Sequence, residues 1–412
     1  MLKLLLGGSG SGKTTLLYQR IRARAEAGEK SILLVPEQFT SSTEGRIHRE
    51  LGDALSGLVE SFSFTSLAEH ILSAEGGSAV QTLSDAGRAV LVRRALEELQ
   101  DNVHYYYRHR RSAAFCQMAA ETIDELKSAG LSGRQLYELA QDCGTDSAKL
   151  SELALIFQGY ETLLAGTGMD PSDRLELAAF RLEAALARGE LPEFLRDRAV
   201  FIDEFDTFNA PKKRLMGALL ASLPTVTVAL CDDGTPLVPG DMSLFSGAKQ
   251  VAAQLRQLAR RNGTAVAVPE LLRRDVRHAD TPGLAAAAQL LAAGRCDPPT
   301  ACPEIKLFAA PSREEEARAA AAAIRRLMRQ GVRCGKVAVV CRDISKYRAA
   351  VKYEFRMADI PRLLRRADDA RVQRPGPRRC GVCWPLPGVA ELTEQLTDPG
   401  QTGSAPVTEE RG

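Results

Sequence analysis

The chain has 412 residues, of which 45% are hydrophobic and 26% are charged, and its 54 basic and 52 acidic residues leave a formal net charge of +2. This composition is typical of folded globular protein, and the length exceeds one ordinary core, so we expect two domains or one domain with a large insertion. A nearly neutral chain is not a polycation, so any attraction to nucleic acid must come from local patches.

The first residues, MLKLLLGG, are too short for a signal peptide, and no apolar stretch reaches the ~18 residues of a membrane span. The nine cysteines are odd in number and scattered, which favours free thiols in a reducing compartment. Cys380 and Cys383 form a C-x-x-C pair that lacks the second half of a zinc site. We therefore expect a cytoplasmic protein that does not act on a membrane.

Leu2–Leu6 is predicted to be a buried strand, and a glycine-rich motif comes directly after it. The motif consists of Gly7, Gly8, Ser9, Gly10, Ser11, Gly12, Lys13 and Thr14. It satisfies G-x-x-x-x-G-K-[ST], in which backbone N–H groups and a helix N-terminus point at a polyphosphate. We expect Lys13 to contact the phosphates of ATP and Thr14 to bind Mg²⁺. The alternative, a glycine-rich turn with a surface lysine, is less favoured because a strand precedes the motif and a helix follows it.

Strands are also predicted at 32–35 and 58–64, and aromatic segments follow both, where ligands bind in parallel sheets. Exposed phenylalanines there can stack on bases. The candidate DNA-binding residues are Gln38, Phe39, Phe62 and Ser63. The alternative is that the phenylalanines belong to the core, which is favoured for Phe64.

From Ser84 to about Leu164 the apolar pattern is helical throughout, with Ser84 as a candidate N-cap. The expected buried face is formed by Val90, Leu91, Ala95, Leu96 and Leu99. The run HYYYRHRR at 104–111 mixes aromatic and basic residues, as single-strand binders do, although a solvated helix surface has the same composition.

Strands return at 199–202 and 225–230, so the helical block is predicted to be an insertion in an α/β domain. The strand at 199–202 ends in Asp203 and Glu204. A phosphate loop requires such a strand, because Asp203 can hold Mg²⁺ opposite Thr14 while Glu204 polarises the attacking water. The alternative is a strand that ends in solvated acids.

After a loop-rich stretch at 232–304, strands at 305–308 and 337–340 and a helix at 314–328 predict the start of a second α/β unit. Beyond Pro361 the sequence is rich in arginine, then in proline and small polar residues, and this composition cannot build a core. We expect residues 362–412 to be disordered or an out-of-frame continuation.

Six segments, in this order, resemble the N-terminal half of the B subunits of bacterial AddAB-type helicase-nucleases, which are related to superfamily 1 helicases. They are GGSGSGKTTLL, LVPEQFT, ESFSFTSLAEHIL, FIDEFDTFNAPKK, VTVALCDD and VAVVCRDISKYRAAVKYEFRMADIP. The resemblance covers residues 1 to about 361, and VPEQFT combined with SFSFTSLA is far more specific than the phosphate loop.

The resemblance implies a P-loop, RecA-like parallel-sheet domain with a helical insertion, followed by the start of a second RecA-like α/β domain. The implied boundaries are 1–83 and 181–300 for domain 1A, 84–180 for domain 1B and 301–361 for the second domain. It also implies that residues 7–14 are helicase motif I, 36–40 motif Ia, Phe62 and Ser63 motif Ib, and Asp203 with Glu204 motif II. Arg342 resembles the motif IV arginine that faces the nucleotide.

The family processes double-strand DNA ends in recombinational repair, so the implied partners are single-stranded DNA, duplex ends and an AddA-like subunit that carries the main motor. Motifs V and VI, the nuclease and the cysteines of an iron-sulfur cluster are expected beyond residue 361, where this sequence has no counterpart. Cys380 and Cys383 do not match the layout of that cluster. We therefore expect the chain itself neither to unwind nor to cut DNA, whereas Glu204 favours ATP hydrolysis in an intact subunit.

Two other functions stay open. A generic P-loop NTPase or kinase for a small molecule would use Lys13 and Asp203 without DNA, and a non-catalytic DNA-binding scaffold would keep a purely structural nucleotide site. DNA-stimulated ATP turnover separates these possibilities.

Overall fold

The computed structural model of the protein describes residues 1–76, 82–294 and 301–360. The chain divides into two compact units, one that covers residues 1–277 and one that begins at His278. The arginine-rich tail and its cysteine pair lie outside the described residues. Within the described ranges, no helix is both long and apolar enough to cross a membrane.

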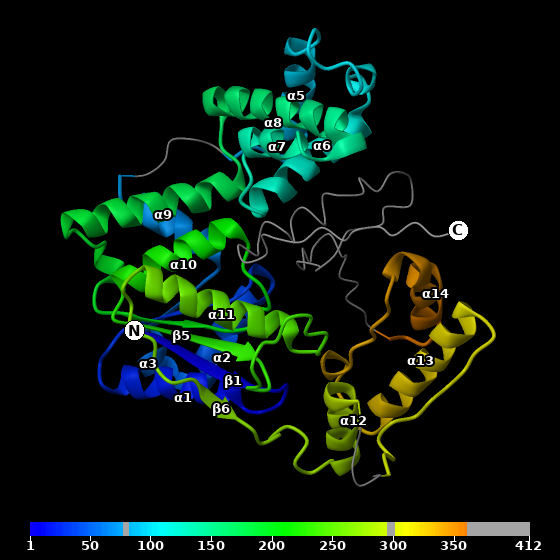
Figure 1. Ribbon diagram of the computed structural model, residues 1–412. Coiled ribbons are helices and arrows are strands. Elements are labelled where there is room, and N and C mark those ends of the chain that lie inside the picture. Colours follow the sequence, from blue (N-terminus) through cyan, green and yellow to red (C-terminus); the bar gives the residue numbers. More distant parts are fainter. Residues whose placement is uncertain (77–81, 295–300, 361–412) are drawn as a thin grey trace, which may run out of the picture. The chain divides into compact units, whose positions relative to one another are not determined.

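The first unit contains a six-stranded parallel sheet with the order β3-β2-β4-β5-β1-β6 (Figure 1). The strands are β1 (Leu2–Gly7), β2 (Ser31–Leu34), β3 (Val59–Phe62), β4 (Ala199–Ile202), β5 (Thr225–Cys231) and β6 (Glu270–Leu272). The α/β class and the first five strands confirm the sequence prediction. The register places Leu4 opposite Val228 and Leu34 opposite Ile202, so the carboxyl ends of the central strands meet at one edge.

Helices cover both faces of this sheet, and the alternation of side chains along β1 decides which residue meets which layer. Leu4 and Leu6 pack with one layer, while Leu5 packs with the other. The first layer is formed by α4 (Phe64–Ala74), α9 (Pro171–Arg188), α10 (Ala210–Ser222) and α11 (Ser246–Arg261). The second layer is formed by α1 (Lys13–Glu26), α2 (Thr40–Leu51) and the short α3 (Asp53–Ser56). Burial on both faces explains why the strands are continuous apolar runs.

The helical block between β3 and β4 has a hydrophobic core of its own. Its helices are α5 (Asp85–Glu98), α6 (Ala113–Ser128), α7 (Gly133–Ala140) and α8 (Ser147–Thr167). The predicted cap is confirmed, because the Ser84 hydroxyl accepts the N–H of Gly87 at 3.2 Å. The predicted buried face was wrong at Val90, which is 64% exposed, whereas Val92 is fully buried. The buried face includes Val92 together with Arg88, which lies one turn earlier on the same side of the helix.

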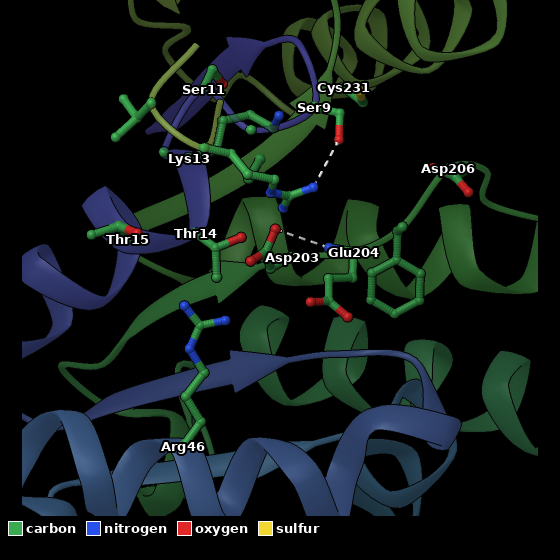
Figure 2. Close-up of a pocket in the computed structure, with 16 residues that line it drawn as sticks. Ser9, Ser11, Lys13, Thr14, Thr15, Arg46, Asp203, Glu204, Asp206 and Cys231 are labelled. Carbon is green, nitrogen blue, oxygen red and sulfur yellow. Dashed lines mark hydrogen bonds between the residues drawn. The ribbon is translucent and has the colours of Figure 1, made fainter. Parts of the chain in front are cut away.

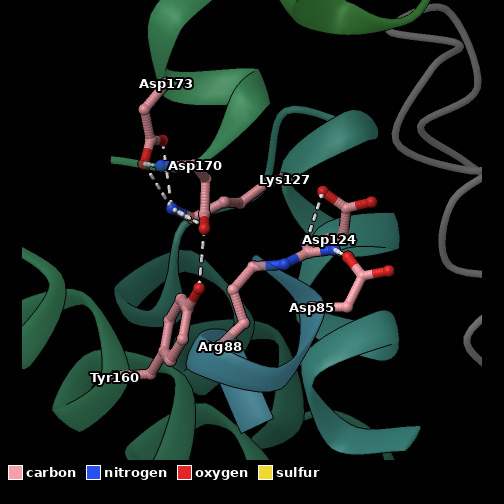
Figure 3. A network of polar contacts seen from close by, with 7 residues as sticks. All are labelled: Asp85, Arg88, Asp124, Lys127, Tyr160, Asp170 and Asp173. Carbon is pink, nitrogen blue, oxygen red and sulfur yellow. Dashed lines mark hydrogen bonds and ion pairs between the residues drawn. The ribbon is translucent and has the colours of Figure 1, made fainter. Parts of the chain in front are cut away.

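The two connections between the block and the sheet run side by side, and a buried polar network lies next to them (Figure 3). The N–H of Leu83 donates to the carbonyl of Met169 at 3.1 Å. Lys127 of α6 contacts Asp170 at 3.0 Å, and the Tyr160 hydroxyl donates to the same carboxylate at 2.7 Å. Asp170 directly precedes α9, whose apolar side packs on the sheet. The network therefore fastens the helical block to the sheet.

The helices of the second unit, in its described part, are α12 (Pro282–Ala293), α13 (Arg313–Arg329) and α14 (Ile344–Met357). Helices α13 and α14 pack around a small core of their own. The predicted helix at 314–328 is confirmed, but the strands predicted at 305–308 and 337–340 were wrong, since neither segment pairs with a strand in the described residues. Leu307 and Val340 are 97% and 90% exposed. The stretch 232–304, which was expected to be rich in loops, also contains α11, β6 and α12.

Candidate functional site

The loop between β1 and α1 has a backbone that only glycine adopts readily. Gly10 and Gly12 have φ angles of 83° and 87°, in the left-handed region. A Cβ atom on Gly10 would approach the Asp275 carboxylate at 2.8 Å and the Cβ of Arg277 at 2.9 Å. Gly12 is the N-cap of α1 and offers no side chain to its first N–H groups. The loop and the helix start therefore present backbone donors, which is the arrangement that binds phosphate.

Lys13 and Ser11 of this loop are among the residues that line a pocket of about 420 Å³ (Figure 2). The Lys13 ammonium donates to the carbonyl oxygens of Gly7 at 2.7 Å and Gly8 at 2.8 Å. Burial lowers the pKa of Lys13, the nearby Cys231 and Asp203 oppose this shift, and the positive charge of Arg277 adds to it. The Ser11 hydroxyl is buried and has no hydrogen-bond partner among the described residues. Together these groups suit an anionic ligand.

Asp203 follows β4 directly and is 5% exposed. Its carboxylate accepts a hydrogen bond from the Thr14 side chain and, at 3.0 Å, from the N–H of Glu204. Burial raises the pKa of Asp203, although these hydrogen bonds and the Lys13 charge lower it in part. The sheet thus brings together Lys13, Thr14 and Asp203, although Asp203 lies far from the other two in the sequence.

Glu204 has a φ of 65°, which is uncommon for a residue with a side chain. Such a conformation costs about 1–3 kcal/mol, and residues that adopt it are enriched at active sites and ligand clamps. Partial burial, followed by the negative charge of Asp203, raises the pKa of Glu204, while Arg46 opposes the shift. The backbone turn places both carboxyl groups at the same pocket, as Figure 2 shows.

Two arginines that the sequence did not indicate also line the pocket. Arg46, from α2, lies over the ring of Tyr18 at 4.6 Å and its guanidinium points toward the two acids (Figure 2). Arg277 follows β6, its side chain donates to the Ser9 hydroxyl at 3.3 Å, and its N–H donates to the carbonyl of Gly10 at 3.1 Å. Both positions depend on tertiary packing, so no local pattern signals them.

Arg342 belongs to the second unit, where it precedes α14 and its side chain is exposed. It is absent from the residues that line the described pocket of the first unit.

The candidate DNA-binding residues lie after β2 and β3, which are neighbours in the sheet. The side chain of Thr65 donates to the Glu37 carboxylate at 2.5 Å and joins the two segments. Gln38 is exposed, whereas Phe39 and Phe62 are half-buried against the core. The fully buried Phe64 is a core residue, as the sequence favoured.

Ser63 has a structural role in addition to any contact with a ligand. Its hydroxyl accepts the N–H of Ser66 at 3.1 Å, and the Ser66 hydroxyl accepts the N–H of Ser63 at 2.8 Å. This reciprocal pair is a capping box at the start of α4.

The pocket residues fit a Mg²⁺-bound nucleotide. The described residues contain no group of three histidine, cysteine or acidic side chains that would hold a metal alone. Mg²⁺, however, usually takes one or two protein oxygens and completes its shell with water and phosphate. Thr14 and Asp203 supply such oxygens, and the uncapped start of α1 and the unpaired Ser11 hydroxyl suit the phosphates.

Comparison with known proteins shows the family to which the chain belongs. Residues 4–286 match the family model described as ADDB, N-terminal. The chain is 32% identical over 375 residues to the B subunit of the ATP-dependent helicase/deoxyribonuclease of Moorella thermoacetica, an alignment that covers 87% of this chain and 32% of that protein. The corresponding B subunits of Desulforudis audaxviator and Geobacillus kaustophilus are 33% and 30% identical, again over 87% of this chain and over 31% and 32% of theirs. The chain thus spans about a third of the length of the curated relatives it matches. It belongs to the AddB family and corresponds to its N-terminal portion.

Proposed function

We propose that this chain is the ATP- and Mg²⁺-binding portion of an AddB-type subunit that acts on DNA ends in the cytoplasm together with an AddA-like partner. The observation that carries the proposal is the convergence of the phosphate loop with Thr14, Asp203 and Glu204 at one edge of a parallel sheet. The names of the relatives, which describe ATP-dependent helicase/deoxyribonuclease subunits, supply the reaction class.

Each pocket residue has a distinct role in this proposal. Lys13 neutralises phosphate charge, and Thr14 and Asp203 hold Mg²⁺, which supplies charge neutralisation at the phosphates when bound. Glu204 orients and polarises the water that attacks the terminal phosphate. Arg277, held against the loop by Ser9 and Gly10, adds a second cation beside Lys13. Burial opposes the charged forms of Lys13, Asp203 and Glu204. A ligand that carries both negative phosphates and a cation stabilises the charged form of each of these three groups.

DNA is proposed to cross the carboxyl ends of β2 and β3 near Gln38, Phe39, Phe62 and Ser63. The half-buried positions of both phenylalanines leave part of each ring for a base. Residues 1–83 and 181–300 are proposed as domain 1A, 84–180 as domain 1B and 301–361 as part of the second motor-like domain, where Arg342 is the proposed arginine of motif IV.

Nucleotide binding is tested with a fluorescent ATP analogue in the presence of Mg²⁺. We expect Lys13→Ala to abolish binding, because it removes the cation that faces the phosphates. Lys30→Ala is the matched control, since Lys30 is exposed and is not among the residues that line the pocket. Equal affinity of Lys13→Ala and the parent protein would refute the proposed nucleotide site.

Turnover is tested with the intact B subunit, of which this chain corresponds to the N-terminal portion, combined with an AddA-like subunit and DNA. We expect Glu204→Gln to retain the ATP analogue and to remove the part of the turnover that depends on this chain. Turnover that ignores DNA would favour a small-molecule NTPase or kinase. Binding without any turnover attributable to this chain would favour the non-catalytic DNA-binding scaffold.

A further inference from the structure

The turn that joins α5 and α6, residues 104–111, is held rigidly by one carboxylate. Glu152 of α8 accepts the N–H groups of His104 at 3.0 Å, Tyr105 at 2.9 Å and Tyr106 at 3.1 Å. Three charge-assisted hydrogen bonds from consecutive residues fix the backbone of this segment, which we call the basic turn. Side chains on the basic turn are therefore presented from a fixed frame, which lowers the entropic cost of binding a partner.

The aromatic rings of the basic turn are already engaged within the protein. Tyr106 is buried and stacks on Phe115, with ring centroids 5.6 Å apart. The guanidinium of Arg110 lies over the Tyr107 ring at 3.9 Å, and that of Arg108 lies over the Tyr105 ring at 5.5 Å. These contacts oppose the stacking of nucleic-acid bases on the rings, although the sequence is typical of single-strand binders. The aromatic residues instead position the arginines.

The basic turn has an excess of positive charge that nearby acids do not cancel. Residues 102–113 contain three arginines and no acidic residue, and Arg108 and Arg111 are exposed. Glu152 is committed to backbone N–H groups. The preceding acids Glu97 and Glu98 pair at 3.1 and 2.9 Å with arginines of their own helix, α5. Asp101, the acid nearest to the turn in the sequence, is exposed, and with it residues 101–113 still carry one negative charge against three arginines.

We propose that the basic turn binds the sugar-phosphate backbone of duplex DNA, away from the proposed contacts at the sheet edge. This inference rests on the proposed function, because it assumes that DNA is the partner. Guanidinium groups on a fixed backbone, two of them held over tyrosine rings, suit a regular array of phosphates. B-DNA presents one charge per roughly 1.7 Å of its axis. The binding is expected to be independent of base sequence, because contacts to phosphates carry no sequence information.

The test compares the full chain with an Arg108→Gln/Arg111→Gln variant for binding to a fluorescent duplex of about 30 bp between roughly 50 and 200 mM salt. Each lost phosphate contact lowers the slope of log K against log salt by about 0.9. The double variant should therefore show a fall in slope of about 1.8, so its loss of affinity over this fourfold salt range is about 12-fold smaller than that of the parent. Arg134→Gln is the control, because Arg134 is 86% exposed on α7 of the same block.

The outcomes separate this inference from the function on which it rests. An unchanged slope in a double variant that folds normally by circular dichroism overturns the role of the basic turn, whereas the proposed DNA-binding function survives. Failure of the parent protein to bind any DNA overturns both the role of the basic turn and the proposed DNA-binding function. The proposed nucleotide site is tested separately, by ATP binding. A Tyr105→Leu variant that loses single-stranded DNA more than duplex would also refute the inference, because it would show base stacking.

Discussion

Lys127→Met should destabilise the first unit strongly, because it leaves a buried carboxylate without its cation. Lys127 is 8% exposed and Asp170 only 1%, and their charged groups are 3.0 Å apart. Burial alone lowers the pKa of Lys127, but Asp173 and Asp170 outweigh this effect and raise it, so the lysine is charged at neutral pH. Breaking such a pair from one side costs about 3–5 kcal/mol. At roughly 2 °C per kcal/mol for a unit of this size, the melting temperature should fall by about 6–10 °C.

The measurement is thermal unfolding followed by far-ultraviolet circular dichroism. Arg93→Met is the control, since Arg93 pairs with Glu97 on the surface of α5 with both side chains at least half exposed. A pair of that kind contributes about 0.3–0.5 kcal/mol, which corresponds to a fall of about 1 °C. If Lys127→Met and Arg93→Met lower the melting temperature equally, the network does not fasten the helical block as argued.

Three further predictions concern the site and its surroundings. Burial raises the pKa of Asp203, so its ionised form opposes folding, and Asp203→Asn should raise the melting temperature at about pH 8. This gain in melting temperature should vanish in acid, below the ordinary carboxyl pKa of about 3.9, because the carboxyl group is then neutral in both the folded and the unfolded state. A gain that persists in acid would contradict the argument. Gly12→Ala should lower the free energy of unfolding by about 1–2 kcal/mol because of the left-handed backbone alone, since the nearest atom is 3.8 Å from the added Cβ. Gly45→Ala, inside α2, should raise the free energy of unfolding by about 0.5–1 kcal/mol. Ser63→Ala should lower the free energy of unfolding, measured by chemical denaturation, by about 0.5–2 kcal/mol, because it removes the capping box of α4. A smaller loss would mean that the capping box contributes little to stability.

The parallel sheet could be predicted because its central strands are apolar runs bounded by glycine or acidic residues. Val200 and Ile202 are fully buried in β4, and the acids begin where the strand ends at the sheet edge. The convergence of Thr14 and Asp203 followed from motif spacing and from the rule that ligands bind at the carboxyl ends of parallel strands.

Other features depended on contacts that the sequence does not encode locally. β6 has only three residues and pairs with β1 alone, so it lacks the apolar run of a central strand. Arg277 reaches the phosphate loop only because β6 carries the chain there. Helix α11, by contrast, has its buried Val251, Leu255 and Ala259 at helical spacing and should have been found. The apolar segments at 305–308 and 337–340 were assigned from composition alone, without a strand to pair with.

The adjacent connections at Thr82 and Met169 have a consequence for how the molecule can be rebuilt. The ends of the inserted segment are hydrogen-bonded to each other, so the sheet is joined by the same two points whatever the length of the insertion. The length of the segment therefore has little effect on the entropy lost when the sheet forms. The helical block could therefore be replaced by a shorter linker, or carry additional helices, without a change in strand order. A chain cut between α6 and α7 should keep the sheet intact for the same reason, because Lys127 then stays on α6 and Asp170 stays on the connection that leads to α9.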